Sequence, residues 1–130
     1  MKNIKMTVHC LYGIVISALA ICFITIATPS HAETLTTCDF VSLKASIETL
    51  NSGDGGDISF DCAGTIRFTE MLKIESDVTI TSADDVILDG YGQFTLFEVT
   101  GSLTLNAVTI QTGWTAVNNR GRLTITDSIF

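Results

Sequence analysis

Gly101-Ser102-Leu103-Thr104-Leu105-Asn106-Ala107-Val108-Thr109-Ile110 recurs twenty residues later as Gly121-Arg122-Leu123-Thr124-Ile125-Thr126-Asp127-Ser128-Ile129-Phe130. The two stretches share Gly, Leu and Thr at equivalent positions, and each holds two short apolar segments separated by a small or polar pair. A fixed period of about twenty residues is typical of a solenoid, in which each repeat buries its apolar face by stacking on its neighbours. We therefore expect this stretch to belong to a stack of similar coils.

Short segments of the same kind precede the repeat. They alternate polar and apolar residues and are rich in β-branched and aromatic side chains, as strands are. No helical pattern follows residue 51. An antiparallel meander would look similar, but the regular period and the scarcity of Asn-Gly turns favour a right-handed coil with three short strands per turn. The segments are Asp57–Phe60, Ile66–Phe68, Leu72–Ile74, Val78–Ile80, Val86–Leu88 and Leu96–Val99.

The period also predicts which residues stack. The fold expected is all-β, a right-handed parallel β-helix of about three coils. The strands of the last coil are expected at Thr115–Asn118, Arg122–Ile125 and Ser128–Phe130, above predecessors at Thr95–Val99, Ser102–Leu105 and Val108–Ile110. The stacked pairs expected are Leu103 with Leu123, Leu105 with Ile125, Val108 with Ser128, Ile110 with Phe130, and Thr104 with Thr124 as an outward ladder.

Residues 1–32 have the pattern of a secretory signal peptide. Lys2 and Lys5 supply a positive start, and residues 7–27 contain no acidic residue, Lys or Arg. Ser30 and Ala32 are small residues at the −3 and −1 positions, which predicts cleavage after Ala32. An uncleaved membrane anchor is the alternative, because the apolar run approaches the roughly 20 residues that span a bilayer. A lipoprotein would use Cys22, but the residue before it is an isoleucine rather than a small residue.

The remainder, residues 33–130, is acidic. It carries all 14 acidic residues of the chain against five basic ones, a net charge of −9. Such a surface argues against nucleic acid as a binding partner, because contact with phosphates requires a basic surface. It also argues against docking on anionic lipid, so contact with a membrane is expected only through an uncleaved signal segment. The length fits one small domain.

Cys38 and Cys62 are the cysteines that remain after this segment. An even number in an exported chain predicts a disulfide. A metal pair is disfavoured, because the spacing is not C-x-x-C and both histidines lie within residues 1–32. We therefore expect a structural bridge between these two residues.

A short amphipathic helix is predicted between the cysteines. Thr37 or Asp39 can cap it, and it should end at the turn-rich residues 51–56. We expect residues 33–56 to form a capping helix and loop that covers the first coil, and residues 57–130 to form the coils. The apolar face is formed by Phe40, Leu43, Ile47 and Leu50.

The loop Gly53-Asp54-Gly55-Gly56-Asp57 combines glycines with two aspartates. Loops of this composition hold calcium in some proteins, but they more commonly turn the chain sharply. Because the loop has two carboxylates and the pattern does not recur, we interpret it as a turn. The sequence therefore predicts no metal ion and no other cofactor.

Several of these segments resemble exported bacterial right-handed parallel β-helix proteins. Cys38-x4-Leu43-x3-Ile47-x3-Asn51, followed by Asp57–Cys62, resembles their N-terminal start, and Ile87-Leu88-Asp89-Gly90 resembles their next block. Residues 113–118 and 121–130 resemble the repeat of polymorphic outer membrane proteins, although Trp114 and Thr115 replace small residues of that pattern. The resemblance implies a pectin-lyase-like fold and a location outside the cytoplasm: extracellular, at the cell surface, in the outer membrane or in the periplasm.

The resemblance implies a structural or adhesive, non-enzymatic surface module. The same fold hosts pectate lyases and polygalacturonases, so a remnant of a polysaccharide-active enzyme is the alternative. Asp84-Asp85 is the only adjacent acidic pair, and neighbouring strand residues point to opposite faces, so we assign no catalytic residue. Asp89 is interpreted as a turn-former before Gly90.

Trp114, Arg120 and Arg122 are candidate carbohydrate contacts. A tryptophan in a loop beside the coils could stack on a sugar ring, although packing over the coil edge is the alternative. The two arginines fall on one coil and could approach the same sugar, or remain solvated surface. The partner expected is a surface glycan or a protein.

The chain stops at Phe130, inside the repeat and before the asparagine with which the family pattern continues. An uncovered coil exposes an apolar edge that can pair with another chain. We therefore expect either a fragment or truncated member, or self-association or partner binding through this edge.

Overall fold

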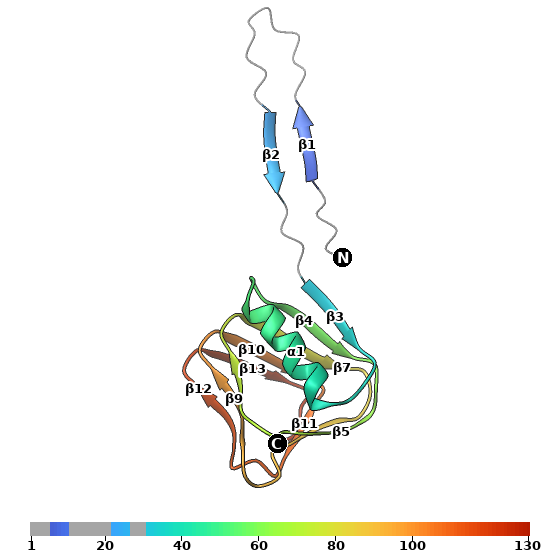
Figure 1. The fold of residues 1–130 in the computed structure, drawn as a ribbon, viewed down its shortest axis with the longest axis vertical. Helices are drawn as coiled ribbons and strands as arrows, with labels where there is room; N and C mark the ends of the chain where they lie inside the picture. The colour runs from blue at the N-terminus through green and yellow to red at the C-terminus, as the bar shows by residue number, and fades with distance from the viewer. Residues whose placement is uncertain (1–5, 11–21, 27–30) are drawn as a thin grey trace, which may run out of the picture.

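A computed structural model of the chain describes residues 6–10, 22–26 and 31–130. Strands β1 (Met6–Cys10) and β2 (Cys22–Ile26) pair antiparallel and stand apart from the body of the molecule (Figure 1). Most of the predicted signal segment, residues 1–32, lies outside the described residues. Among the helices that are described, none is long and apolar enough to cross a membrane.

The rest of the described chain is mostly strands with one helix. Eleven strands form three sheets in which every pair is parallel, ordered β13-β10-β7-β4-β3 (first sheet), β11-β8-β5 (second) and β12-β9-β6 (third). The elements are β3 (His31–Leu35), α1 (Phe40–Asn51), β4 (Gly56–Phe60), β5 (Gly64–Arg67), β6 (Leu72–Ile74), β7 (Asp77–Ser82), β8 (Val86–Asp89), β9 (Thr95–Val99), β10 (Ser102–Asn106), β11 (Thr109–Gln111), β12 (Thr115–Asn119) and β13 (Arg122–Thr126).

From β4 onward the chain passes through the first, second and third sheets in the same order three times. We call each pass a circuit: β4-β5-β6, β7-β8-β9 and β10-β11-β12, with β13 opening a fourth. The predicted stacking is confirmed, since Leu103 lies opposite Leu123 and Leu105 opposite Ile125. The predicted strand Ser128–Phe130, which follows β13, is shorter than predicted, because it pairs only through a bridge between Thr109 and Ile129.

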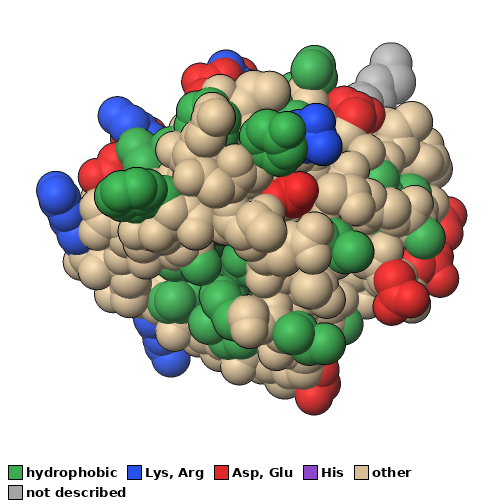
Figure 2. Space-filling model, turned by 90° about the horizontal axis from the view of Figure 1, so that it is seen from below, with side chains coloured by type: hydrophobic (Ala, Val, Ile, Leu, Met, Phe, Trp, Pro, Cys, Tyr) green, Lys and Arg blue, Asp and Glu red, His purple; other side chains and the backbone are tan. Residues whose placement is uncertain are grey.

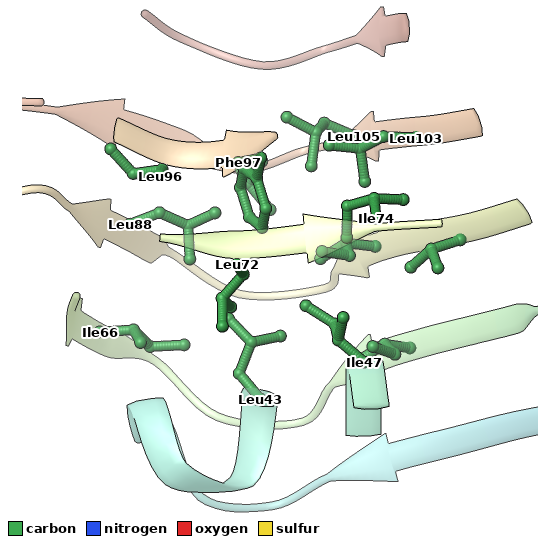
Figure 3. Packing of buried hydrophobic residues seen from close by; sticks show 14 of the residues in the cluster. Leu43, Ile47, Ile66, Leu72, Ile74, Leu88, Leu96, Phe97, Leu103 and Leu105 are labelled. Atoms are coloured by element: carbon green, nitrogen blue, oxygen red, sulfur yellow. The ribbon is translucent and has the colours of Figure 1, made fainter. Parts of the chain in front are cut away.

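Apolar side chains line up in columns across the circuits and fill the space between the sheets. Figure 3 shows them in layers, with α1 at the bottom and the last strand at the top. The inner members are fully buried, whereas Ile125 in the last circuit is 43% exposed. One column from each sheet reads Ile58-Ile80-Leu105-Ile125, Ile66-Leu88-Ile110 and Leu72-Phe97-Val117.

Helix α1 covers one end of this core, as predicted. Its buried residues Leu43, Ile47 and Leu50 face the first circuit, and the helix lies across the front of the sheets in Figure 1. Asp39, one of the two predicted caps, starts the helix by accepting a hydrogen bond from the Ser42 N–H at 2.8 Å. Burial of this apolar face stabilises the helix, which is too short to be stable by itself in water.

Both ends of α1 are fastened to the circuits. The predicted disulfide joins Cys38, just before the helix, to Cys62 in the corner between β4 and β5. At the other end the Asn51 amide donates to the Lys73 carbonyl at 2.8 Å and accepts from the Glu75 N–H at 3.0 Å. The helix therefore acts as a fixed cover on the first circuit.

Close backbone approach explains the recurring glycines of the repeat. A Cβ on Gly121 would lie 2.1 Å from the Gly101 carbonyl oxygen, and one on Gly101 would lie 2.5 Å from the Ser76 carbonyl oxygen. No side chain fits at either distance, so glycine is required wherever the corner between the third and first sheets stacks on the one below.

Strand β3 was not predicted. It pairs parallel with β4 as the outermost strand of the first sheet, and Leu35 is its buried residue. Only this one apolar side chain is buried by the strand, which explains why no clear alternation marks it in the sequence. The predicted cleavage after Ala32 falls inside β3 and would leave Glu33–Leu35 opposite Ile58–Phe60.

Candidate functional site

Two loops stack at the corner between the second and third sheets. They are residues 90–94, between β8 and β9, and residues 112–114, between β11 and β12. The Trp114 N–H donates to the Phe94 carbonyl at 3.1 Å. A Cβ on Gly90 would lie only 2.6 Å from the Cα of Gly113, so the two backbones are in direct contact. The loops are thereby held as one unit.

This corner presents aromatic rings to solvent. Trp114 is 80% exposed and Tyr91 is 56% exposed. The Arg67 guanidinium, on β5, lies 4.3 Å from the centre of the Tyr91 ring, which is a cation–π contact. We call Arg67, Tyr91 and Trp114 the aromatic corner. Figure 2 views the molecule from this side and shows hydrophobic side chains at the surface, with charged ones mostly around the edge.

The Asp89 side chain joins the two loops through hydrogen bonds. It is 7% exposed, and one carboxylate oxygen accepts from the Tyr91 N–H at 2.8 Å and from the Thr112 hydroxyl. The hydrogen bond from Thr112, together with that from Tyr91, lowers the pKa of Asp89 below its usual value, and the charge of Arg67 acts in the same direction. Asp89 is a turn-former as predicted, but it also joins two circuits.

The predicted contacts do not all lie together. Trp114 precedes β12, whereas Arg120 and Arg122 follow its other end, so a strand of five residues separates them. An extended strand of that length spans roughly 17 Å, more than one sugar ring covers. Trp114 instead shares its corner with the loop that carries Tyr91, to which it is bonded through the Phe94 carbonyl, and Arg67 contacts Tyr91.

No family model, curated protein or solved structure matches this chain. The candidate sites are therefore assigned from the residues and their geometry.

Arg120 belongs to a second, polar surface on the third sheet. Lys73, Glu98 and Asn118 lie in register on β6, β9 and β12. The Arg120 guanidinium lies 3.9 Å from the Glu98 carboxylate. A shallow depression of about 170 Å³ opens here, lined by Lys73, Glu75, Glu98 and Thr100. Both charge signs meet in it, so it favours neither anions nor cations.

The acidic residues considered for catalysis or for calcium lie apart from both surfaces. Asp84 and Asp85 are exposed in the corner between β7 and β8, where Ser82 bonds the backbone of Asp84. Asp54 precedes β4 and Asp57 is its second residue, on either side of Gly55 and Gly56, and both aspartates are exposed. Within the described part of the chain, no group of three or more His, Cys, Asp or Glu side chains is placed to hold a metal ion.

Sequence reasoning missed Arg67, Tyr91 and the bond between Asp89 and Thr112. Tyr91 and Thr112 have positive φ angles of 50° and 47°, which residues other than glycine seldom adopt. A turn around Gly90 was visible in the sequence. Its contact with a loop more than twenty residues later depends on the stacking of the circuits, and no local pattern records it.

Replacing Asp89 by asparagine is expected to lower the free energy of unfolding by about 1–2 kcal/mol near neutral pH, since the amide oxygen still accepts but the negative charge that strengthens both buried hydrogen bonds is lost. The folded-state pKa is depressed, so the stabilisation is present above the unfolded pKa of about 3.9 and is lost as pH falls through the folded pKa. The difference between the two proteins should therefore shrink below about pH 4. Urea unfolding at several pH values measures it, with Asp61→Asn, at an exposed position, as the control.

Proposed function

We propose that the chain is a right-handed parallel β-helix module of an exported surface protein, with a structural or adhesive role. Three passes through three parallel sheets, in constant order and register, are the observation that carries the proposal. Parallel strands in one sheet are joined by right-handed crossovers in nearly all proteins, which supports the handedness. The regular circuits also support the resemblance to polymorphic outer membrane protein repeats.

Export is supported by four features of the chain. Residues 1–32 read as a signal peptide with a cleavage site after Ala32. The disulfide between Cys38 and Cys62 suits an oxidising compartment. Cleavage after Ala32 would keep Leu35, the buried residue of β3, in the folded domain. The strong negative charge of residues 33–130 favours solubility outside the cell.

An adhesive role is supported by the aromatic corner. Exposed Trp and Tyr rings on a fixed backbone can stack on the apolar face of a sugar with little loss of side-chain entropy. The two loops that carry these rings are held by backbone contact and by Asp89. We therefore assign a glycan as the ligand class of this corner, and Arg67 as the group that orients Tyr91.

The full chain, exported and purified in its oxidised form, tests the proposal on a panel of immobilised polysaccharides that includes polyuronates. Retention is expected without release of unsaturated or reducing sugar, with or without calcium. Trp114→Ala should weaken retention about tenfold, the effect of losing one stacked ring. Val41→Ala, which removes a 76% exposed apolar side chain from α1, should have no effect.

Two results would overturn this proposal. Turnover of a polyuronate that Asp84→Ala or Asp85→Ala abolishes would favour the polysaccharide-active enzyme instead. Failure to bind any glycan of the panel, or binding that Trp114→Ala leaves unchanged, would remove the role of the aromatic corner.

A further inference from the structure

A row of polar side chains crosses the second sheet next to the aromatic corner. Arg67, Asp89 and Gln111 lie in register on β5, β8 and β11, and we call them the polar row. Strands in a sheet are about 4.8 Å apart, so a single sugar ring can reach two neighbouring members. Side chains alternate along a strand, and the residue before each member is buried in the core, so the row points outward. Those buried residues are Ile66, Leu88 and Ile110.

The polar row and the aromatic corner form one surface. The Arg67 guanidinium contacts the Tyr91 ring, and the Asp89 carboxylate accepts from the Tyr91 N–H. The Gln111 carbonyl accepts from the Gly90 N–H at 3.1 Å, which holds the end of β11 against the loop that carries Tyr91. A ligand stacked on Tyr91 is therefore within reach of the polar row.

The charges of the polar row cancel. The Arg67 guanidinium is positive at physiological pH. Hydrogen bonds from Thr112 and Tyr91 hold the pKa of Asp89 below its usual value, so its carboxylate is negative at neutral pH. Gln111 is uncharged, and the next outward row of the same sheet carries no charge either. That row consists of Thr65, Ile87 and Thr109. The surface therefore offers no net attraction to a charged ligand.

The two exposed members of the polar row, Arg67 and Gln111, have the groups that sugar hydroxyls need. A guanidinium only donates hydrogen bonds, whereas the Gln111 amide both donates and accepts, as a hydroxyl does. A carboxylate ligand only accepts. Beside Arg67 it would approach the charge of Asp89 and leave the side-chain oxygen of Gln111 without a donor. The hydrogen-bonding groups therefore suit adjacent hydroxyls better than an acid.

The opposite end of the second sheet is acidic. Asp61 lies in the corner before β5, Asp84 and Asp85 lie in the corner before β8, and all three are exposed. A polyuronate chain that extended along the sheet from the aromatic corner would meet these carboxylates. Residues 33–130 as a whole carry a net charge of −9, which also repels a polyanion.

We propose that the glycan bound at the aromatic corner is an uncharged sugar chain, whose adjacent hydroxyls are recognised by Arg67 and Gln111. Asp89 is a positioning residue, which balances the charge of Arg67 and holds the Tyr91 loop. This inference rests on the proposed glycan-binding role of the aromatic corner and adds the class of sugar to it.

Calorimetric titration of the full exported, oxidised chain tests the inference. The probes are neutral hexasaccharides of glucose, mannose and xylose, beside hexagalacturonate. At least one neutral probe should bind about tenfold more tightly than hexagalacturonate, and its affinity should not depend on salt concentration. Gln111→Ala should weaken binding of that neutral probe about fivefold, because hydrogen bonds to its hydroxyls are lost.

Asp89→Asn tests the balance of charge. It leaves Arg67 uncompensated, so affinity for hexagalacturonate should rise about tenfold, while affinity for the neutral probe should change by less than about threefold. A merely structural role of Asp89 would lower both affinities together. Asp61→Asn is the matched control, because it removes the same charge from the chain at the other end of the sheet. It should leave both affinities unchanged.

The outcomes separate this inference from the proposal on which it rests. Wild-type protein that binds hexagalacturonate at least as tightly as every neutral probe, with Trp114→Ala weakening that binding, would overturn the inference and leave the glycan-binding role intact. Equal gains in Asp89→Asn and Asp61→Asn, or equal losses of both ligands in Asp89→Asn, would overturn the role of the polar row. Absence of binding to all the probes and to the polysaccharide panel would overturn the proposed function and this inference with it.

Discussion

Replacing both Cys38 and Cys62 by alanine is expected to lower the free energy of unfolding by about 3 kcal/mol. The bridge closes a loop across a sequence separation of 24 residues, and loop-closure entropy in the unfolded chain gives an effect of this size. A domain of about one hundred residues has only about 5–15 kcal/mol in total, so the loss is a large fraction. Urea unfolding of the wild-type and variant proteins measures it.

The reduced wild-type protein is the control for this prediction. It keeps both cysteine side chains, as thiols, without the bond, so its stability should be close to that of the double variant. The size of the loss should also reflect how firmly α1 is held on the first circuit, because the bridge holds one end of the helix and Asn51 holds the other. A double variant as stable as the oxidised protein would show that packing of α1 alone fixes the cover on the first circuit.

Phe97→Ala is expected to cost about 3–5 kcal/mol, the usual range for a large aromatic residue removed from a core. Phe97 is fully buried in the middle circuit, and its ring lies 5.4 Å from that of Phe68, edge on. Phe68 in turn lies 5.2 Å from Phe40 on α1. The three rings connect the helix to the second circuit, so truncation leaves a cavity that neighbouring strands, held in register on both sides, cannot close.

Val117→Ala is the matched control for Phe97→Ala. Val117 occupies the same column one circuit later and is only partly buried. Its truncation should cost about 1 kcal/mol or less, as expected for two methyl groups at a partly solvated position. Equal effects at the two positions would contradict the gradient of burial from the helix-covered end to the last strand.

Much of the fold was predictable because its repeats are close in sequence and nearly identical in pattern. The recurrence of Gly101 as Gly121 indicated a close backbone contact between repeats. The apolar alternation around Leu103 and Leu105 predicted the register of the last circuits. The helix and the bridge were predictable from local signals, namely the apolar spacing after Asp39 and the pairing of two cysteines.

The candidate site was less predictable, because it is formed across circuits. Trp114 was visible as an aromatic residue in a loop, but the stacking of its loop on the one that carries Tyr91 became apparent only in the structure. Arg120 appeared close to Trp114 in sequence, yet β12 holds them apart. Residues near one another along an extended strand are distant in space, whereas residues one circuit apart are in contact.

The corners between sheets differ in how much their length varies. The corner between the third and first sheets contains two residues every time, at 75–76, 100–101 and 120–121. The corner that carries Tyr91 and Trp114 contains four, five and three residues, at 68–71, 90–94 and 112–114. Insertions and deletions are therefore tolerated at one edge while the strand register is kept. During evolution, a lineage could change what this surface recognises by lengthening or shortening that edge alone, without redesigning the core.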